Sequence, residues 1–179
     1  MSVKSFKTSG VGVDLAPKGL VLINTTSFSG VTSISLAADT FTSTYTNYRI
    51  MLSEVYGATS GNGVNLRLRK AGTDNTTASS YRRRGYLAGA SLVLTAGDDT
   101  SYYLTNVNSG STAPTSGIIE LLQPKKNNQT TIQAIFYDAD GERTLTSAGR
   151  HTVVDTFDSA TFFSPVNLTG TVSVYGYNI

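Results

Sequence analysis

Short segments with a two-residue apolar period are the feature that most limits the fold of this chain. Residues 64–68 read Val-Asn-Leu-Arg-Leu, and Ile132, Ala134 and Phe136 alternate in the same way with the residues between them. Successive side chains of a strand point to opposite faces, so this alternation is typical of strands with one buried face. No window of about twelve residues has the i, i+3, i+4, i+7 apolar spacing of an amphipathic helix. The sequence therefore predicts an all-β chain with little or no helix.

Clusters of Gly, Ser, Asn, Asp and Thr separate these segments at the intervals of a β-sandwich or barrel. Residues 138–141 contain Asp-Gly, a strong hairpin signal, and residues 61–63 and 97–99 are further predicted turns. No internal repeat of roughly 20–50 residues is present, which disfavours a propeller or solenoid. The predicted strands lie near residues 20–26, 30–37, 46–56, 63–69, 80–87, 91–95, 101–107, 117–123, 130–137, 150–157, 160–164 and 170–177.

The length and composition predict one globular domain. A chain of 179 residues buries about 70% of its unfolded surface on folding. No run approaches the roughly 20 apolar residues of a membrane-spanning helix, so no membrane partner is expected. Residues 1–18 hold three lysines, two glycines and a proline without sustained periodicity, and we expect an extended N-terminal arm there. Residues 19–179 are expected to form a single jelly-roll-like β-sandwich.

Charge and cysteine content exclude some classes of site. The chain has no cysteine, which removes disulfides and thiolate metal sites, so its stability must come from packing, hydrogen bonding or assembly. A formal net charge of +2 is too small to predict nucleic-acid binding from bulk electrostatics.

His151 is the only histidine and therefore the only candidate base for a Ser-His-Asp triad. The nearest downstream acid, Asp155, would share a strand face with it at a distance of about 13 Å, too far for a hydrogen bond. No Gly-x-Ser-x-Gly nucleophile signature is present in the sequence. We therefore predict no catalytic residue and no enzymatic activity, and we expect His151 to be a partly exposed residue at a strand end.

Asp138, Asp140 and Glu142 are the strongest candidates for a calcium site. In a calcium-binding EF-hand loop the glycine stands at position six, whereas Gly141 is the fourth residue from Asp138. We interpret the segment as a solvated hairpin turn and expect neither a metal nor another cofactor.

Arg82, Arg83 and Arg84 lie between Tyr81 and Tyr86, a basic and aromatic combination that can bind nucleic acid. Strand geometry, however, places Arg83 on the face of Tyr81, and Arg82 and Arg84 on the face of Tyr86. Because the charge is divided between two faces, nucleic acid is not the favoured partner. We predict that these arginines form ion pairs with a neighbouring subunit, with an ordinary solvated strand as the alternative.

Ten tyrosines can serve either as core residues or as interface anchors. The chain has no tryptophan, so glycan binding gains no specific support from the sequence.

Four segments resemble a family of small structural proteins of tailed-bacteriophage virions, which occur as head decoration (cement) proteins and as tail or fibre modules. The resemblance spans nearly the whole chain after residue 16, and strand-and-turn patterns carry it rather than a chemical signature. The segments are Pro17–Ile23, Phe41–Ile50, Ile118–Leu122 and Gly170–Tyr177.

The resemblance implies a jelly-roll-like sandwich that forms a symmetric homotrimer and binds a larger assembly in the virion. The leading hypothesis is a capsid decoration protein that binds the major capsid protein and stabilises the coat shell. The alternative is a tail or tail-fibre module that contacts host glycan or another tail protein. The Thr-rich strands supply an independent reason to assemble, because they carry little of the lysine or proline that protects strand edges. Lys4, Lys7 and Lys18 of the arm are candidate contacts with the neighbouring coat or tail protein.

Overall fold

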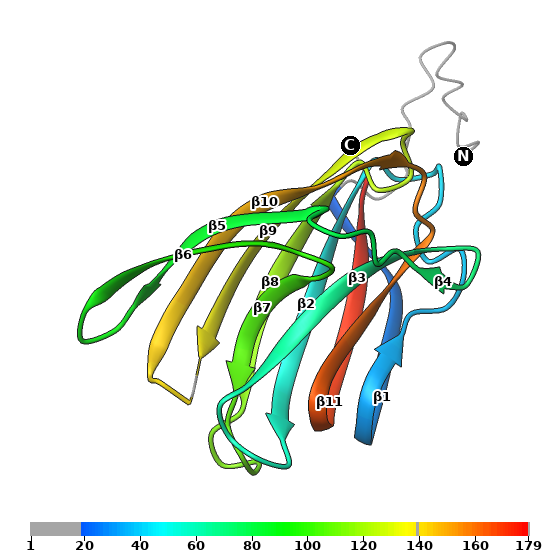
Figure 1. Ribbon diagram of the computed structural model, residues 1–179. Helices are drawn as coiled ribbons and strands as arrows, with labels where there is room; N and C mark the ends of the chain where they lie inside the picture. Colours follow the sequence, from blue (N-terminus) through cyan, green and yellow to red (C-terminus); the bar gives the residue numbers. More distant parts are fainter. Residues whose placement is uncertain (1–18, 139, 179) are drawn as a thin grey trace, which may run out of the picture.

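The structure is a computed structural model that describes residues 19–138 and 140–178, and this part of the chain is all-β (Figure 1). It contains eleven strands and no helix, and hence no helix that could cross a membrane. The strands are β1 (Gly19–Ser35), β2 (Asn47–Gly57), β3 (Asn62–Lys70), β4 (Thr73–Asp74), β5 (Tyr81–Ala88), β6 (Leu92–Asp99), β7 (Tyr102–Val107), β8 (Thr115–Leu122), β9 (Asn128–Asp138), β10 (Arg143–Asp155) and β11 (Ser159–Asn178).

All predicted strand segments fall in or overlap observed strands, but several boundaries differ. The first two predicted segments merge into β1, and the last two merge into β11. The predicted turn at 97–99 is wrong, because these residues continue β6 in a regular pairing with β5. The prediction also missed residues 143–149 of β10, a Thr-, Ser- and Gly-containing stretch, and the two-residue strand β4.

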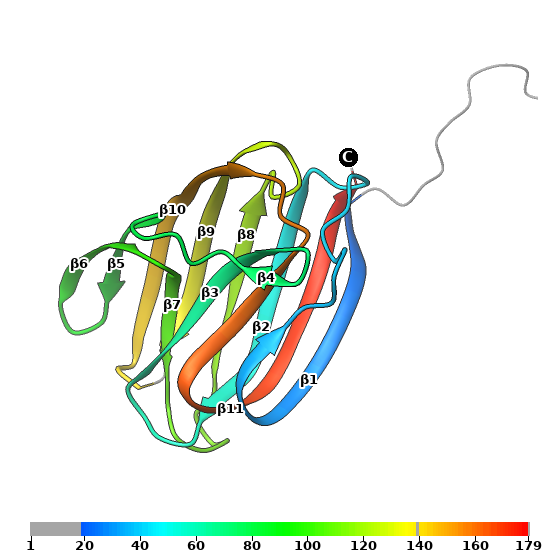
Figure 2. The ribbon, with the colours of Figure 1, turned by 45° about the vertical axis from the view of Figure 1, so that its right-hand side comes forward.

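The strands form two layers that share β1 and β11 (Figure 2). The larger layer runs in the order β1, β11, β2, β8, β9, β10, β5, β6, and every pairing in it is antiparallel. The smaller layer consists of the end of β1, the start of β11, then β3 and β7, with β4 paired to the end of β3. The result is a strongly curled antiparallel sheet that folds over itself as a sandwich.

β11 passes from one layer to the other through a break in its pairing with β1. The step from Phe163 to Leu168 on β11 faces only the step from Ser33 to Val31 on β1. Pro165 lies inside this bulge, where a residue without an N–H group removes no ladder hydrogen bond. The surplus residues bend the strand, so β11 pairs with β3 before the bulge and with β2 after it.

The core lies between the two layers. The predicted alternation is confirmed: Ile132, Ala134 and Phe136 of β9 are buried, whereas Ile135 and Tyr137 are exposed. Tyr102 of β7 reaches them from the smaller layer, with its hydroxyl 3.5 Å from the carbonyl oxygen of Ile132. The largest fully buried side chains are Tyr48, Tyr81, Tyr102, Phe41, Phe136, Phe157, Phe162, Ile50, Leu66, Leu68, Leu104 and Ile119.

The prediction that His151 is a partly exposed residue at a strand end is wrong, because the side chain is completely buried and the residue lies within β10. Its ring packs against Tyr81 at 4.3 Å and against Phe157 at 5.0 Å between ring centroids. Nε2 lies 3.1 Å from Oδ1 of Asn75, which can only accept, so Nε2 carries the proton. Burial lowers the pKa of His151 to about 4 despite the charge of Asp155. The burial of His151 could not be predicted from its position in the sequence, because the loop residue Asn75, which contacts the ring, is distant in the sequence.

The predicted arm, residues 1–18 with Lys4, Lys7 and Lys18, lies outside the described residues.

The buried histidine makes the stability of the fold pH-dependent. Unfolding restores an ordinary pKa near 6.5, so the unfolded chain binds a proton that the folded chain does not bind between about pH 6.5 and 4. The contribution of this group is complete above pH 6.5 and is lost as the pH falls toward 4, by up to about 3 kcal/mol.

Urea unfolding of wild type and His151→Gln between pH 7.5 and 4 measures this contribution. As the pH falls over this window, we expect the free energy of unfolding to decrease more steeply for the wild type than for His151→Gln. The carboxylates titrate in both proteins, so their contribution cancels in the difference between the two profiles. Parallel pH profiles would contradict the assignment.

Candidate protein-binding face

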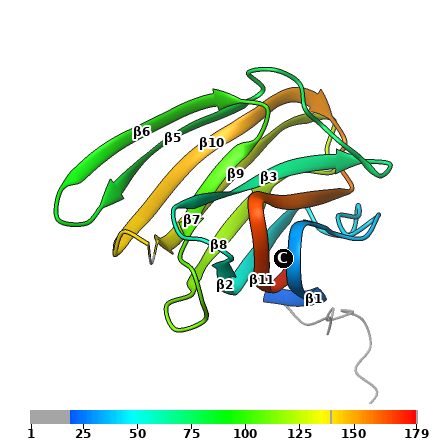
Figure 3. The same ribbon diagram turned by 60° about the horizontal axis from the view of Figure 1, so that its bottom comes forward.

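The outward surface of the larger layer carries an apolar row that crosses several strands. Five exposed or half-exposed side chains belong to it: Met51 of β2, Ile118 of β8, Ile135 of β9, Tyr86 of β5 and Leu94 of β6. We call these five residues the apolar row. The strands that carry it run side by side in Figure 3.

The strand register is what joins these residues. Met51 lies opposite Ile118, and Ile118 lies opposite Ile135. Thr146 of β10 then connects Ile135 to Tyr86, which lies opposite Leu94. Directly opposite residues in an antiparallel pair have Cβ atoms about 5 Å apart, so the row is a continuous strip of side chains.

The apolar row is unusually accessible for residues of this kind. Leu94 is 82% exposed, Ile135 49% and Tyr86 41%. Beside the row, between β5, β10 and β9, lies a depression of about 410 Å³. Ala148, at the next outward position of β10, is a small residue in its lining. The face therefore offers both projecting side chains and a recess, a relief that suits a complementary protein surface.

Arginines border the apolar row on one side. Arg84 of β5 forms an ion pair with Asp98 of β6 at 3.0 Å, and this hydrogen bond lowers the pKa of Asp98. Arg82 lies opposite Arg150 of β10, and both are exposed. Among the described residues, neither Arg82 nor Arg150 forms an ion pair, although Asp98 also lies opposite Arg82. The border therefore presents more positive than negative charge.

The predicted division of the arginine triplet is confirmed by burial. Arg82 and Arg84 are exposed with Tyr86, whereas Arg83 is only 9% exposed on the inner face. Arg83 donates to Thr95 Oγ1 at 2.7 Å, and its guanidinium lies 5.1 Å from the ring centroid of Tyr103. This residue therefore stabilises the packing of β5 and β6 against β7 and does not reach the surface. Of the triplet, only Arg82 and Arg84 remain candidate assembly contacts.

A second polar group fixes the β2 and β8 part of the face. Glu120 of β8 accepts a 2.6 Å hydrogen bond from Nε of Arg49 and a 2.7 Å hydrogen bond from the hydroxyl of Tyr177. The hydrogen bond to Glu120 raises the pKa of Arg49. The pKa of Tyr177 is raised mainly by burial and also by its hydrogen bond to Glu120. Because its charge is paired, this group adds rigidity rather than free charge.

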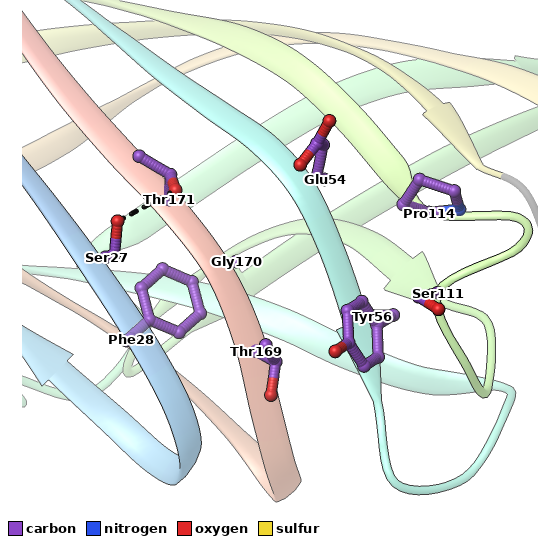
Figure 4. A pocket seen from close by; sticks show the side chains of 9 residues that line it. All are labelled: Ser27, Phe28, Glu54, Tyr56, Ser111, Pro114, Thr169, Gly170 and Thr171. Carbon is purple, nitrogen blue, oxygen red and sulfur yellow. Dashed lines mark hydrogen bonds between the residues drawn. The ribbon is translucent and has the colours of Figure 1, made fainter.

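A separate pocket of about 430 Å³ lies at the other end of the outward surface, between β1, β11, β2 and the loop before β8 (Figure 4). Glu54 has a positive φ of 54° and stands in a break of the β2–β8 register. Its backbone N–H donates to Ser116 Oγ at 3.0 Å. In the described residues its carboxylate has no hydrogen-bonding partner. The other lining residues are Ser27, Phe28, Tyr56, Ser111, Pro114, Thr169, Gly170 and Thr171.

The predicted hairpin between β9 and β10 is confirmed, with Asp140 and Glu142 exposed in its turn. The interpretation of the whole segment as solvated is wrong for Asp138, which is completely buried. Its Oδ2 pairs with Arg143 at 2.8 Å, while Oδ1 has no hydrogen-bonding partner within residues 19–138 and 140–178. The three carboxylates thus do not converge, and the described residues contain no group of acidic or histidine side chains arranged for a metal ion.

The sequence analysis placed Tyr86, Arg82 and Arg84 on one face of a strand but missed the apolar row. Ile118, Ile135 and Leu94 look like ordinary strand residues in the sequence. They form one surface only through the strand register.

The position of the acidic residues predicts that divalent metal does not stabilise the fold. Thermal unfolding with and without a chelator should give midpoints within about 5 °C of each other. Removal of a structural ion would lower the midpoint by more than this, because it would cost more than about 1 kcal/mol. A larger drop on chelation would contradict the prediction.

Comparison of the chain with protein-family models, with curated proteins and with solved structures found no match.

Proposed function

We propose that this protein is a non-enzymatic structural protein that binds another protein through the apolar row and its arginine border. The observation that carries the proposal is the unbroken strip from Met51 to Leu94 on a rigid sheet. Following the sequence resemblance, the specific form of the proposal is a virion decoration protein. It would bind the major capsid protein of a tailed bacteriophage as a homotrimer and stabilise the coat shell.

The residue types of the face support protein binding. Tyrosine, methionine and arginine are enriched at protein interfaces, and tyrosine and arginine are frequent among the residues that dominate binding energy. Here Tyr86 and Met51 belong to the row, and Arg82 and Arg84 stand beside it. Sheet positions lose little conformational freedom on binding, which reduces the entropic cost of association.

The charge of the border indicates the chemistry of the partner. Arg82, Arg84 and Arg150 are exposed, and Asp98 offsets only part of their charge. The matching surface should therefore combine apolar side chains with carboxylates, which can accept bidentate hydrogen bonds from guanidinium groups.

The environment of His151 supports a role without catalysis. The ring packs between Tyr81 and Phe157, and its Nε2–H group donates a hydrogen bond to Oδ1 of Asn75. It cannot meet a substrate without local unfolding.

The Glu54 pocket favours a second candidate function, a tail or fibre module that contacts host glycan. Phe28 and Tyr56 supply ring surface, while Ser27, Thr171 and the Glu54 carboxylate supply polar groups (Figure 4). Aromatic surface beside a few hydrogen-bonding groups is an arrangement that can bind a sugar ring. The outward aim of Glu54 depends on its bulge, a device that commonly redirects a side chain.

The apolar row is tested by binding to coat particles that lack this protein. Tyr86→Ala should weaken binding about tenfold or more, because a buried aromatic anchor typically contributes at least 1 to 2 kcal/mol. Arg150→Glu should also weaken binding, and the loss of affinity should be larger at low salt than at high salt. Sedimentation of particles with labelled protein gives the affinity.

Lys126→Glu makes the same charge change at an exposed loop position away from the face and is the matched control. All three variants should unfold within about 1 kcal/mol of wild type, since the substituted side chains are exposed. Full-affinity binding by both face variants would refute the proposal.

The glycan alternative is tested by titration with a panel of host surface oligosaccharides. If the pocket binds sugar, Glu54→Gln should reduce affinity about tenfold through loss of a charged acceptor. Glu142→Gln is the matched control, because Glu142 is another exposed glutamate with a positive φ, of 47°. Absence of sugar binding by the wild type would remove this alternative.

A further inference from the structure

β6 is an unprotected edge strand. It ends the larger layer, and its sequence Leu-Val-Leu-Thr-Ala-Gly-Asp-Asp contains neither lysine nor proline. Leu92, Val93 and Leu94 are 67%, 50% and 82% exposed, so apolar side chains project from both faces of the edge. The β5–β6 hairpin forms the side of the molecule away from β1 in both Figure 1 and Figure 2. Such an edge is a template for an added strand.

The first residues of the chain contain a complementary strand pattern. Val11, Val13 and Leu15 alternate with glycine and aspartate, and Lys7 precedes them. In β6 the order is reversed, since the apolar residues come first and Asp98 and Asp99 follow. An antiparallel alignment can therefore place Lys7 opposite Asp99 and Val13 opposite Val93 at the same time. A parallel alignment that pairs Val11 and Val13 with Leu92 and Leu94 leaves Lys7 at the apolar end of β6, away from both aspartates.

We propose that residues 7–15 of a second copy of this chain add to β6 as an antiparallel strand. The register that places Lys7 opposite Asp99 also places Val13 opposite Val93. The added strand would cover the free backbone groups of β6 and part of its apolar edge. This inference rests on the proposed function only in taking the chain to assemble with copies of itself.

The strand order disfavours the arm of the same chain as the occupant. The arm joins β1, which lies at the opposite edge of the larger layer, with β11, β2, β8, β9, β10 and β5 in between. Seven inter-strand spacings amount to about 34 Å along the sheet. Val11 is eight residues from Gly19 and can reach at most about 27 Å. Along the larger layer, the segment around Val11 therefore does not reach its own β6.

The exchange has a defined symmetry. Each copy donates one arm and accepts one at a different surface, so the contact is heterologous, and copies joined in this way close into a ring when the rotation allows it. This geometry agrees with the homotrimer expected from the resemblance and provides a specific contact for it.

The absence of cysteine from the sequence makes disulfide trapping a clean test. Val13→Cys and Val93→Cys are prepared separately, mixed and mildly oxidised. We expect a disulfide-linked species of twice the 19.0 kDa chain mass in the mixture and little in either variant alone. The double variant should give covalently closed rings of three chains.

Several outcomes would overturn the proposal. Cross-linking of Val93→Cys with itself would indicate β6–β6 pairing, and an internal cross-link in the diluted double variant would place the arm on its own chain. Val13→Cys mixed with Leu22→Cys is the matched control, since Leu22 is an exposed residue of β1 at the other sheet edge. A link there but not at Val93, or no link at all, would equally refute the inference.

A charge exchange tests the register independently. Lys7→Glu in the Val13→Cys background should slow cross-linking to Val93→Cys severalfold, and Asp99→Lys in the Val93→Cys partner should restore it. Failure of the restoring substitution would overturn the proposed register. These assays use purified protein without particles. The strand-addition proposal can therefore be refuted while binding through the apolar row is confirmed, and binding through the apolar row can be refuted while strand addition is confirmed.

Discussion

The pairing of β1 with β11 is the contact on which the rest of the structure depends. It joins the two ends of the described chain over most of the length of both strands. Because β11 bends at the bulge around Pro165, one continuous strand contributes to both layers, pairing first with β3 and then with β2. The core is closed by this bend rather than by a separate connection. A change that straightened β11 would separate the layers and expose the aromatic core.

The smaller layer has fewer strands than the larger layer, and this difference affects which residues are buried toward the β5–β6 side. There the inward positions of β5 and β9 carry Arg83 and Asp138 instead of apolar residues. Arg83 bonds to Thr95 and packs on Tyr103, and Asp138 pairs with Arg143. Polar groups of this kind are tolerated only with partners, because burial without them is costly. β6 lies beyond this boundary, which explains why its apolar side chains remain exposed.

The larger layer thus exposes two distinct apolar surfaces. Its outward surface carries the apolar row beside Arg82 and Arg150, and its free edge carries Leu92 and Val93. The first suits a preformed, complementary protein surface, and the second suits an extended segment that adds a strand. The proposed binding of a partner and the proposed contact between copies would use these two surfaces, which share Leu94.

The sequence by itself determined the fold class and much of the strand layout, because a two-residue apolar period has few other interpretations. It also separated Arg83 from Arg82 and Arg84 on opposite strand faces, since alternation is local, but burial showed which face is the inner one. Only the tertiary structure decided the rest. The apolar row exists because register aligns residues from separate strands, and His151 is buried because a distant loop covers it. Neither fact is local, so no pattern of neighbouring residues encodes it, whereas strand periodicity is fixed by the backbone geometry of each residue.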